Sequence, residues 1–227
     1  MFESIRHALH LLVSGDKEVY AIAWTSLRFA GTSTIICTLI SLPLGVWMGF
    51  HNSRLKKVLA AILNSLIALP TVVIGLLIYS LLSRSAPLGG LGLLFTPTGI
   101  IIGQVVLALP IIASMVYSAL SRLDPRLRET LITLGAPRLS MFWMILRESR
   151  TAILSAILAG FGRVVGEVGV SMMVGGNIRW YTRTLTTAIA LETSKGEFEM
   201  GLALGIILML VAFSINFLLH WTVRHER

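Results

Sequence analysis

The stretch TGIIIGQVVLALPIIASMVYSAL, residues 98–120, contains no Asp, Glu, Lys or Arg. A helix needs about 20 apolar residues to cross the hydrocarbon core of a bilayer, so this stretch is long enough to span a membrane. Of the 227 residues in the chain, 55% are hydrophobic and 13% are charged, and the mean hydropathy is +0.83. An ordinary soluble domain has about twice that share of charged residues. The composition therefore predicts an all-α membrane protein.

Four further stretches are long and apolar enough to cross a membrane. They are residues 29–50, 58–82, 151–176 and 200–223. Residues 1–28 carry several charges and read as an amphipathic, interfacial lead-in, with a short extra span as the alternative. We therefore predict one membrane-spanning domain over residues 1–227, with about five transmembrane helices.

The Lys and Arg residues are divided unequally between the two sides of these spans. Eleven of the 19 lie in the loop after the first span, the loop 121–150 and the C-terminal tail, whereas seven lie on the other side. Cytoplasmic loops of membrane proteins carry the excess of Lys and Arg. We therefore expect an N-terminus outside the cell, and a C-terminus and a loop 121–150 in the cytoplasm. The same rule explains the net charge of +8 without a nucleic-acid partner.

Neither a metal site nor a catalytic site is predicted. Cys37 is the single cysteine, and His7 and His10 share a helix face without a nearby Cys or acidic cluster. Four serines lie in the spans without an adjacent His or Lys to activate them: Ser41, Ser80, Ser114 and Ser171. We therefore do not expect an intramembrane hydrolase.

The loop 121–150 has the pattern helix, glycine corner, helix. Asp124 and Pro125 are typical of a helix start, and Gly135 stands where a helix ends with a positive φ. Pro137 can begin the second helix. The apolar faces are predicted to be Leu127, Leu131 and Leu134 in the first helix, and Leu139, Phe142, Ile145 and Leu146 in the second. A hinged knob of this kind suits the transfer of movement from a soluble partner into the membrane, and an ordinary structured loop is the alternative.

Residues of this loop resemble the "EAA…G…F…I" loop of ABC-importer permeases. The matching residues are Glu129, Leu134, Gly135, Ala136, Phe142 and Ile145. In that family the loop docks into a groove of the ATP-hydrolysing subunit, so the resemblance implies an ATPase-coupling role for these six residues. Two positions depart from the pattern: Thr130-Leu131 replaces the two alanines, and Arg147 stands where a proline is usual.

Longer segments resemble the oxyanion branch of these permeases, which carries molybdate, tungstate and sulfate, and are most similar to its tungstate permeases. They are ALPTVVIGLL (68–77), LALPIIAS (107–114), FGRVVGEVGVSMMVGGNI (161–178) and TRTLTTAIALETSKGEFE (182–199). The resemblance implies a type I importer fold in the cell membrane, a second copy of the chain, a dimer of ATP-binding subunits and an extracytoplasmic substrate-binding protein. ATP and Mg would bind the partner ATPase, and this chain has no GxxxxGK phosphate loop. Molybdate, sulfate or an ion-coupled secondary transporter are the alternatives.

The fourth span contains the pair Arg163 and Glu167, which are spaced to meet on one helix face. A charge within hydrocarbon costs about 2.5–3.5 kcal/mol on insertion scales, so the pair should face a partner or water. Two interpretations stand: the pair lies on the translocation pathway, with Arg163 available to an oxyanion, or it is a structural salt bridge. Arg179 and Arg183 lie in the polar stretch 177–199, where the resemblance places contact with the delivery protein, and a solvated loop is the alternative.

Local patterns also predict how the spans bend and pack. Pro43, Pro70 and Pro110 lie inside spans and should bend their helices, because proline removes a backbone donor. Four segments place two glycines on one helix face: Gly45 with Gly49, Gly99 with Gly103, Gly162 with Gly166, and Gly201 with Gly205. Such pairs favour close contact between membrane helices.

Overall fold

The computed structural model describes residues 2–50 and 54–224. Within these two ranges the chain forms eleven α-helices, one short 3₁₀ helix and no β-strand. The predicted all-α class is therefore confirmed.

The first long helix is longer than the sequence pattern indicated. Helix α1 (Phe2–Val13) is followed by α2 (Lys17–Phe50), which begins at Lys17 rather than near residue 29. Asp16 caps α2, because its Oδ1 accepts the N–H groups of Glu18 (2.9 Å) and Val19 (3.0 Å). Val19, Ile22 and Ala23 are buried against the C-terminal third of the chain, so residues 17–28 are the first turns of a packed helix and not a separate lead-in.

Two of the predicted spans are broken. Helices α3 (Arg54–Ile67) and α4 (Thr71–Leu82) meet at 101°, and α8 (Arg150–Val165) and α9 (Gly169–Gly175) meet at 58°. Pro70 lies in the first break with an extended backbone, as proline chemistry predicts. The predicted bend at Pro70 is therefore confirmed within 58–82, whereas the break within 151–176 was not predicted, because no proline lies there.

Within the described residues, three uninterrupted helices are long and apolar enough to cross a membrane. These segments are Lys17–Gly49 of α2, Pro97–Ser121 (α5) and Phe198–Trp221 of α11 (Phe198–Arg224). If each bent pair is one span, the number rises to five. Pro43 and Pro110 lie inside α2 and α5 without ending them.

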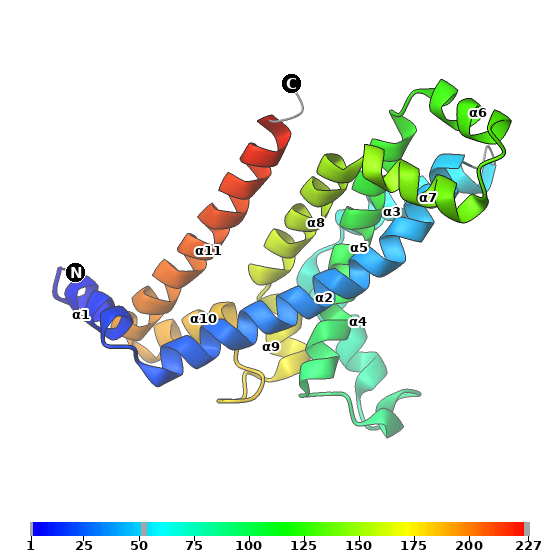
Figure 1. Cartoon of the computed structure of the whole chain (residues 1–227). Helices are drawn as coiled ribbons and strands as arrows, with labels where there is room; N and C mark the ends of the chain where they lie inside the picture. Colours follow the sequence, from blue (N-terminus) through cyan, green and yellow to red (C-terminus); the bar gives the residue numbers. More distant parts are fainter. Residues whose placement is uncertain (1, 51–53, 225–227) are drawn as a thin grey trace.

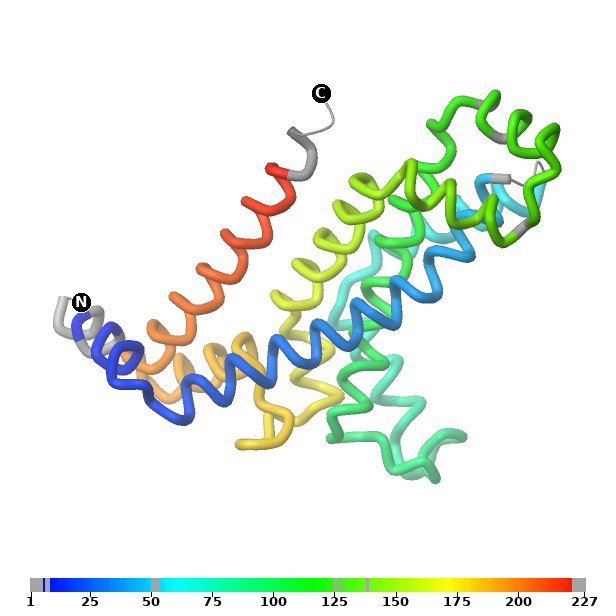
Figure 2. Tube along the Cα trace, viewed as in Figure 1, coloured from blue at the N-terminus to red at the C-terminus, as the bar shows by residue number. Residues whose placement is uncertain are grey.

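The short helices gather at two opposite ends of the bundle (Figure 1). At one end lie α6 (Pro125–Thr133) and α7 (Arg138–Glu148), near the C-terminal end of α11. At the other end lie α10 (Leu185–Lys195), the start of α2 and the 3₁₀ helix η1 (Gly89–Leu91). We call these the α6–α7 end and the α10 end. The tube in Figure 2 follows α2 along the whole distance between them.

Helix α5 forms the centre of the bundle and packs against α2, α3, α8 and α9. Glycine allows two of these approaches: a Cβ at Gly45 would lie 2.5 Å from Cγ1 of Val116, and a Cβ at Gly103 would overlap Val170. The predicted close contact is thus confirmed at the first two glycine pairs. It is wrong for the pairs at 162–166 and 201–205, where an added Cβ would meet other atoms only at ordinary contact distance or none within 4 Å.

Candidate functional site

The hinge at the α6–α7 end has the predicted local geometry. The Oδ1 of Asp124 accepts the N–H of Arg126 (2.9 Å) and so caps α6. Gly135 ends the helix with φ +67°, and the N–H of Ala136 donates to the carbonyl of Leu131 (3.0 Å). Pro137 is extended and begins α7. The expectation of helix, glycine corner and helix is confirmed.

Two side chains anchor this hinge to the membrane helices. Leu131 of α6 and Ile145 of α7 are 3% and 1% exposed, and both belong to the core cluster formed by α2, α5 and α8. Ala136 packs against the same cluster, and Phe142 is half-buried beside Trp143 with ring centroids 5.5 Å apart. The anchors hold the corner at a defined position against α5 and α8.

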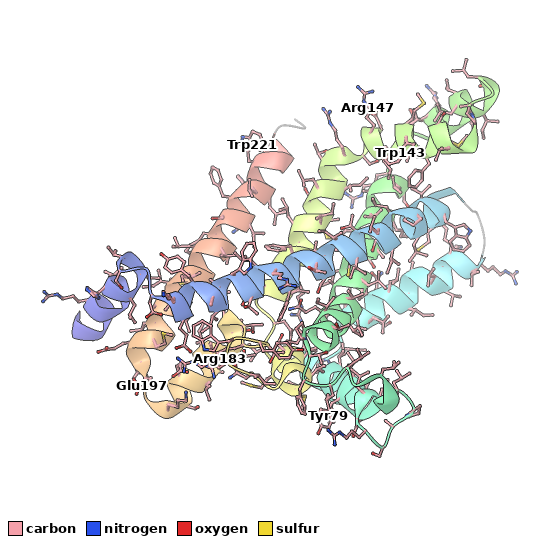
Figure 3. The ribbon with its side chains drawn as sticks, turned by 60° about the horizontal axis from the view of Figure 1, so that its bottom comes forward. Tyr79, Trp143, Arg147, Arg183, Glu197 and Trp221 are labelled. Carbon is pink, nitrogen blue, oxygen red and sulfur yellow. The ribbon has the colours of Figure 1, made fainter. Side chains whose placement is uncertain are left out.

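Other apolar side chains of the hinge point to the surface instead. Leu134 and Leu139 are 76% and 68% exposed, so the apolar faces predicted for the two helices are only partly buried. They form part of an exposed apolar surface, here called the loop patch, which consists of Ile132, Leu134, Leu139, Trp143 and Met144. Glu129 of α6 is also exposed. Figure 3 shows Trp143 and Arg147 at this end, far from Arg183 and Glu197 at the opposite end.

The hinge continues directly into α8. Ser149 is the only residue between α7 and α8, and it serves as the last cap of one helix and the first cap of the other. The carbonyl of Ser149 accepts the N–H of Ile153 (2.9 Å). Helices α7 and α8 are therefore separated by a single residue.

At the far end of α8 lies the predicted charged pair. Nη1 of Arg163 donates to Oε2 of Glu167 at 2.8 Å. Glu167 does not continue α8, however: it lies in the break before α9, and its other oxygen, Oε1, accepts the N–H of Val170 (3.2 Å). The expectation that both residues occupy one helix face is corrected accordingly. The Glu167 side chain is 2% exposed and that of Arg163 36% exposed, so the guanidinium remains partly open while the carboxylate is enclosed.

The two helix breaks of the protein adjoin each other at this pair. A Cβ at Gly169 would lie 3.2–3.3 Å from Val72, from Oγ1 of Thr71 and from Oε1 of Glu167. The first residues of α4 and α9 therefore meet beside the Glu167 carboxylate. We call this group the break site, consisting of Thr71, Arg163, Glu167 and Gly169. The sequence indicated the charged pair. The Ala-Leu-Pro segment at 68–70 was the sequence signal for the other helix break, which lies beside this pair in the structure.

At the α10 end, both predicted surface arginines are paired. Arg179 binds Glu18 through two of its nitrogens, with Nε 2.8 Å from Oε1, and Nη1 of Arg183 lies 3.2 Å from the same oxygen. This hydrogen bond and the charge of Glu18 raise the pKa of the Arg179 guanidinium above its ordinary value. Arg179 is 57% exposed, whereas Arg183 is 11% exposed, so only Arg179 lies openly on the surface.

The stretch 177–199 is not the simple polar loop that was expected. It contains α10, which begins with a capping box between Thr184 and Thr187. Glu192 of α10 lies 3.8 Å from Arg183 and 3.1 Å from Nζ of Lys195. These residues line an open groove with mixed charge: Glu18, Arg179, Arg183, Glu192, Lys195, Glu197 and Met200. Its acidic side chains balance its basic ones, and Glu18 was missed because it lies 161 residues from Arg179 in the sequence.

No cluster of three or more His, Cys, Asp or Glu residues suited to a metal ion occurs in the described ranges 2–50 and 54–224. The chemistry available at the break site is instead that of a partly open guanidinium beside an enclosed carboxylate. Such a pair can attract an anion weakly without holding it, because the carboxylate offsets most of the positive charge.

Residues 41–227 match the family described as the binding-protein-dependent transport system inner membrane component, and the chain belongs to this family. It is a membrane permease subunit of a transport system rather than an enzyme. The chain is 39% identical over 214 residues to the tungstate uptake system permease protein TupB of Peptoclostridium acidaminophilum, with 94% of each chain covered. It is also 39% identical over 220 residues to TupB of Campylobacter jejuni, which covers 97% of this chain and 92% of that protein.

A more distant relative is the molybdenum transport system permease protein ModB of Azotobacter vinelandii, which is 29% identical over 219 residues. Among solved structures, the inward-facing MetNI methionine ABC transporter matches with a TM-score of 0.71 and 21% identity, covering 90% of this chain and 94% of that chain. An amino acid ABC transporter matches with a TM-score of 0.68 and 17% identity, covering 94% and 96%. These structures confirm the fold of a type I ABC-importer permease.

The predicted class is thus confirmed as an ABC-importer permease of the branch that includes tungstate and molybdate transport proteins. Membership implies a multi-pass protein of the inner membrane, an ATPase partner and a substrate-binding protein.

Proposed function

We propose that this chain is the permease of an ATP-driven importer for the oxyanion tungstate. The carrying observation is identity over nearly the whole chain: 39% to two tungstate permeases, against 29% to a molybdenum permease. Molybdate and sulfate are the alternatives within the same branch. An ion-coupled secondary transporter fits less well, because it needs a coupling-ion site and the carboxylate of Glu167 is already neutralised by Arg163.

The α6–α7 end faces the cytoplasm in this proposal, with the N-terminus outside and the C-terminus inside. The support is the excess of cations at this end, where several are exposed: Arg54, Lys57, Arg122, Arg126, Arg147 and Arg150. Trp143 and Trp221 lie at this end, whereas Tyr79 lies at the other (Figure 3). Amphipathic aromatic rings favour the two membrane–water interfaces, which fits spans that run between these ends.

The loop patch is the proposed docking surface for the ATP-binding subunit. Glu129, Leu134 and Gly135 contact the partner directly because they are exposed, whereas Ile145 acts as an anchor because it is buried. Ala136 and Phe142 are intermediate in exposure, and they fix the corner to the core. ATP and Mg bind the partner ATPase in this arrangement, and no cofactor is assigned to this chain.

The break site lies on the proposed translocation pathway, which a second copy of the chain completes. Arg163 is partly exposed, and the twelve-residue helix α4 begins beside Glu167, so that its positive N-terminal dipole adds to the charge of the guanidinium. Glu167 offsets this charge and prevents a passing divalent oxyanion from being trapped. Arg163 and Glu167 thus act together in transport.

The α10 end is the proposed contact face for the extracytoplasmic delivery protein. Arg179 is available at its surface, and Trp180 beside it is 60% exposed. Arg183 supports this face from below, since it is largely covered and binds Glu18 and Glu192.

The test is ATP hydrolysis by the permease reconstituted in vesicles with its ATP-binding subunit. We expect tungstate-loaded delivery protein to stimulate hydrolysis about tenfold, within the range of coupling between distant binding sites. Sulfate should produce no comparable stimulation. Stimulation by sulfate alone would reject the assigned anion, and failure of every loaded delivery protein to stimulate hydrolysis would reject the importer.

A further inference from the structure

We propose that Glu167 is a joint between three helices, and that Thr186 is the positioning residue that fixes this joint to α10. The joint would connect the coupling hinge at one end of the bundle with the delivery face at the other. This inference rests on the proposed importer function.

Glu167 forms hydrogen bonds to three helices, including one from its own N–H to the carbonyl of Val164 in α8 (3.2 Å). Its Oε2 accepts from Nη1 of Arg163 in α8 (2.8 Å), and its Oε1 accepts from the N–H of Val170 in α9 (3.2 Å). Its main-chain carbonyl accepts from Oγ1 of Thr186 in α10 (2.7 Å). Glu167 is 3% exposed, so water does not readily replace any of these bonds. A shift of α8 therefore displaces atoms that α9 and α10 also hold.

The first turn of α10 is fixed to the rest of the α10 end. The N–H of Leu185 donates to Oγ of Ser26 in α2 (2.6 Å), and Nδ2 of Asn177 donates to the carbonyl of Thr187 (3.2 Å). Thr186 itself is 6% exposed. Because α10 is held on these sides, a displacement of the Glu167 carbonyl either moves α10 or breaks the bond from Thr186.

The far end of α10 reaches the mixed-charge groove through Glu192 and Lys195. At the other end of the pathway, α8 follows the hinge directly after Ser149, and Leu131 and Ile145 of the hinge pack in the same core cluster as α8. One chain of contacts thus leads from the hinge through α8 and Glu167 to Thr186 and the delivery face. In this account the bond from Thr186 carries the signal that a loaded delivery protein has docked.

The decisive variants are Thr186→Val and Thr186→Ser. Valine is nearly isosteric with threonine but has no hydroxyl, whereas serine keeps the donor. In vesicles with the ATP-binding subunit, we expect Thr186→Val to assemble and to keep its basal ATP hydrolysis. Stimulation by tungstate-loaded delivery protein should fall about fivefold, the factor that corresponds to the loss of the neutral hydrogen bond to Glu167. Valine also removes the 3.2 Å contact between the hydroxyls of Thr186 and Thr184, the N-cap of α10, and serine can keep both interactions. Thr186→Ser should remain close to the wild type.

Ser194→Ala is the matched control, because Ser194 lies on the same helix and its hydroxyl bonds only to its own helix at the exposed surface. Wild-type stimulation in Thr186→Val would overturn the joint while leaving the importer intact. An equal loss of basal and stimulated hydrolysis would also overturn it, since that result indicates a structural role only. If Thr186→Val does not assemble, Thr186→Ala is judged by the same two rates. Absence of stimulation in the wild type would instead reject the proposed function.

Discussion

Replacing Arg163 by alanine is expected to destabilise the folded permease by about 3 kcal/mol, the lower end of the range for breaking a buried ion pair. The reason is the enclosed carboxylate of Glu167, whose side chain is 2% exposed and would lose its charged partner. The reverse change, Glu167→Ala, leaves an arginine that is already 36% exposed but removes the acceptor for the N–H of Val170. Thermal unfolding of the purified permease measures both effects.

Neutralising both residues separates the two roles of the pair. The double variant Arg163→Gln with Glu167→Gln keeps an amide oxygen that can accept the N–H of Val170 and leaves no unpaired buried charge. The stability of the folded permease should therefore return close to that of the wild type. If Arg163 attracts the oxyanion, ATP-dependent tungstate uptake should stay about tenfold below that of the wild type, because the attraction of a divalent anion is lost. Arg84→Gln, a change of an exposed arginine outside the site, is the control. Uptake at the wild-type rate in the double variant would make the pair a structural lock.

The second large effect is expected at the glycine corner. Gly135 has φ +67°, and a non-glycine residue in this region costs about 1–3 kcal/mol, with the greatest resistance from β-branched side chains. No atom lies within 4 Å of an added Cβ, so the effect of Gly135→Val comes from the backbone and not from a clash. The altered corner should displace the loop patch and reduce both tungstate uptake and binding of the ATP-binding subunit about tenfold.

Gly135→Asn provides the matched comparison, because asparagine adopts left-handed backbone angles more readily than valine. Asparagine has a longer side chain than valine, yet Gly135→Asn should keep most of the transport activity because asparagine tolerates the positive φ. Equal binding and transport by Gly135→Val and the wild type would show that the corner does not couple the two subunits. Equal damage by both substitutions would show that the effect comes from bulk instead of φ.

Local chemistry was sufficient to predict the hinge, whereas the full length of α2 and the break between α8 and α9 were not predicted. The Asp124 cap and the positive φ of Gly135 depend on residues within a few positions, so the sequence reports them directly. The positions of the helix breaks are harder to predict, because Pro43, Pro70 and Pro110 all lie within apolar stretches and the sequence does not distinguish them. Only Pro70 lies at a break, while α2 and α5 continue past the other two within the contacts between them.

Long-range pairing explains the remaining differences. Glu18 belongs to the α10 end because α2 extends far enough to bring it to Arg179. The two residues are far apart in the sequence, so no local pattern predicts this contact. The sequence did not distinguish Thr186 from the other threonines of the polar stretch. The positioning role proposed for it depends on its hydrogen bond to the carbonyl of Glu167, which lies in the break between α8 and α9. Spacing placed Leu134 and Leu131 on one apolar face of α6, yet Leu131 is buried and Leu134 is exposed, a difference that spacing alone does not predict.

The most direct test of the account is tungstate accumulation in sealed vesicles that contain the permease and its ATP-binding subunit. Delivery protein is placed on the side of the α10 end, and ATP on the side of α6 and α7. The account predicts accumulation that requires ATP, the ATP-binding subunit and the delivery protein together. Accumulation driven by an ion gradient without the ATP-binding subunit, or none with all components present, would contradict it.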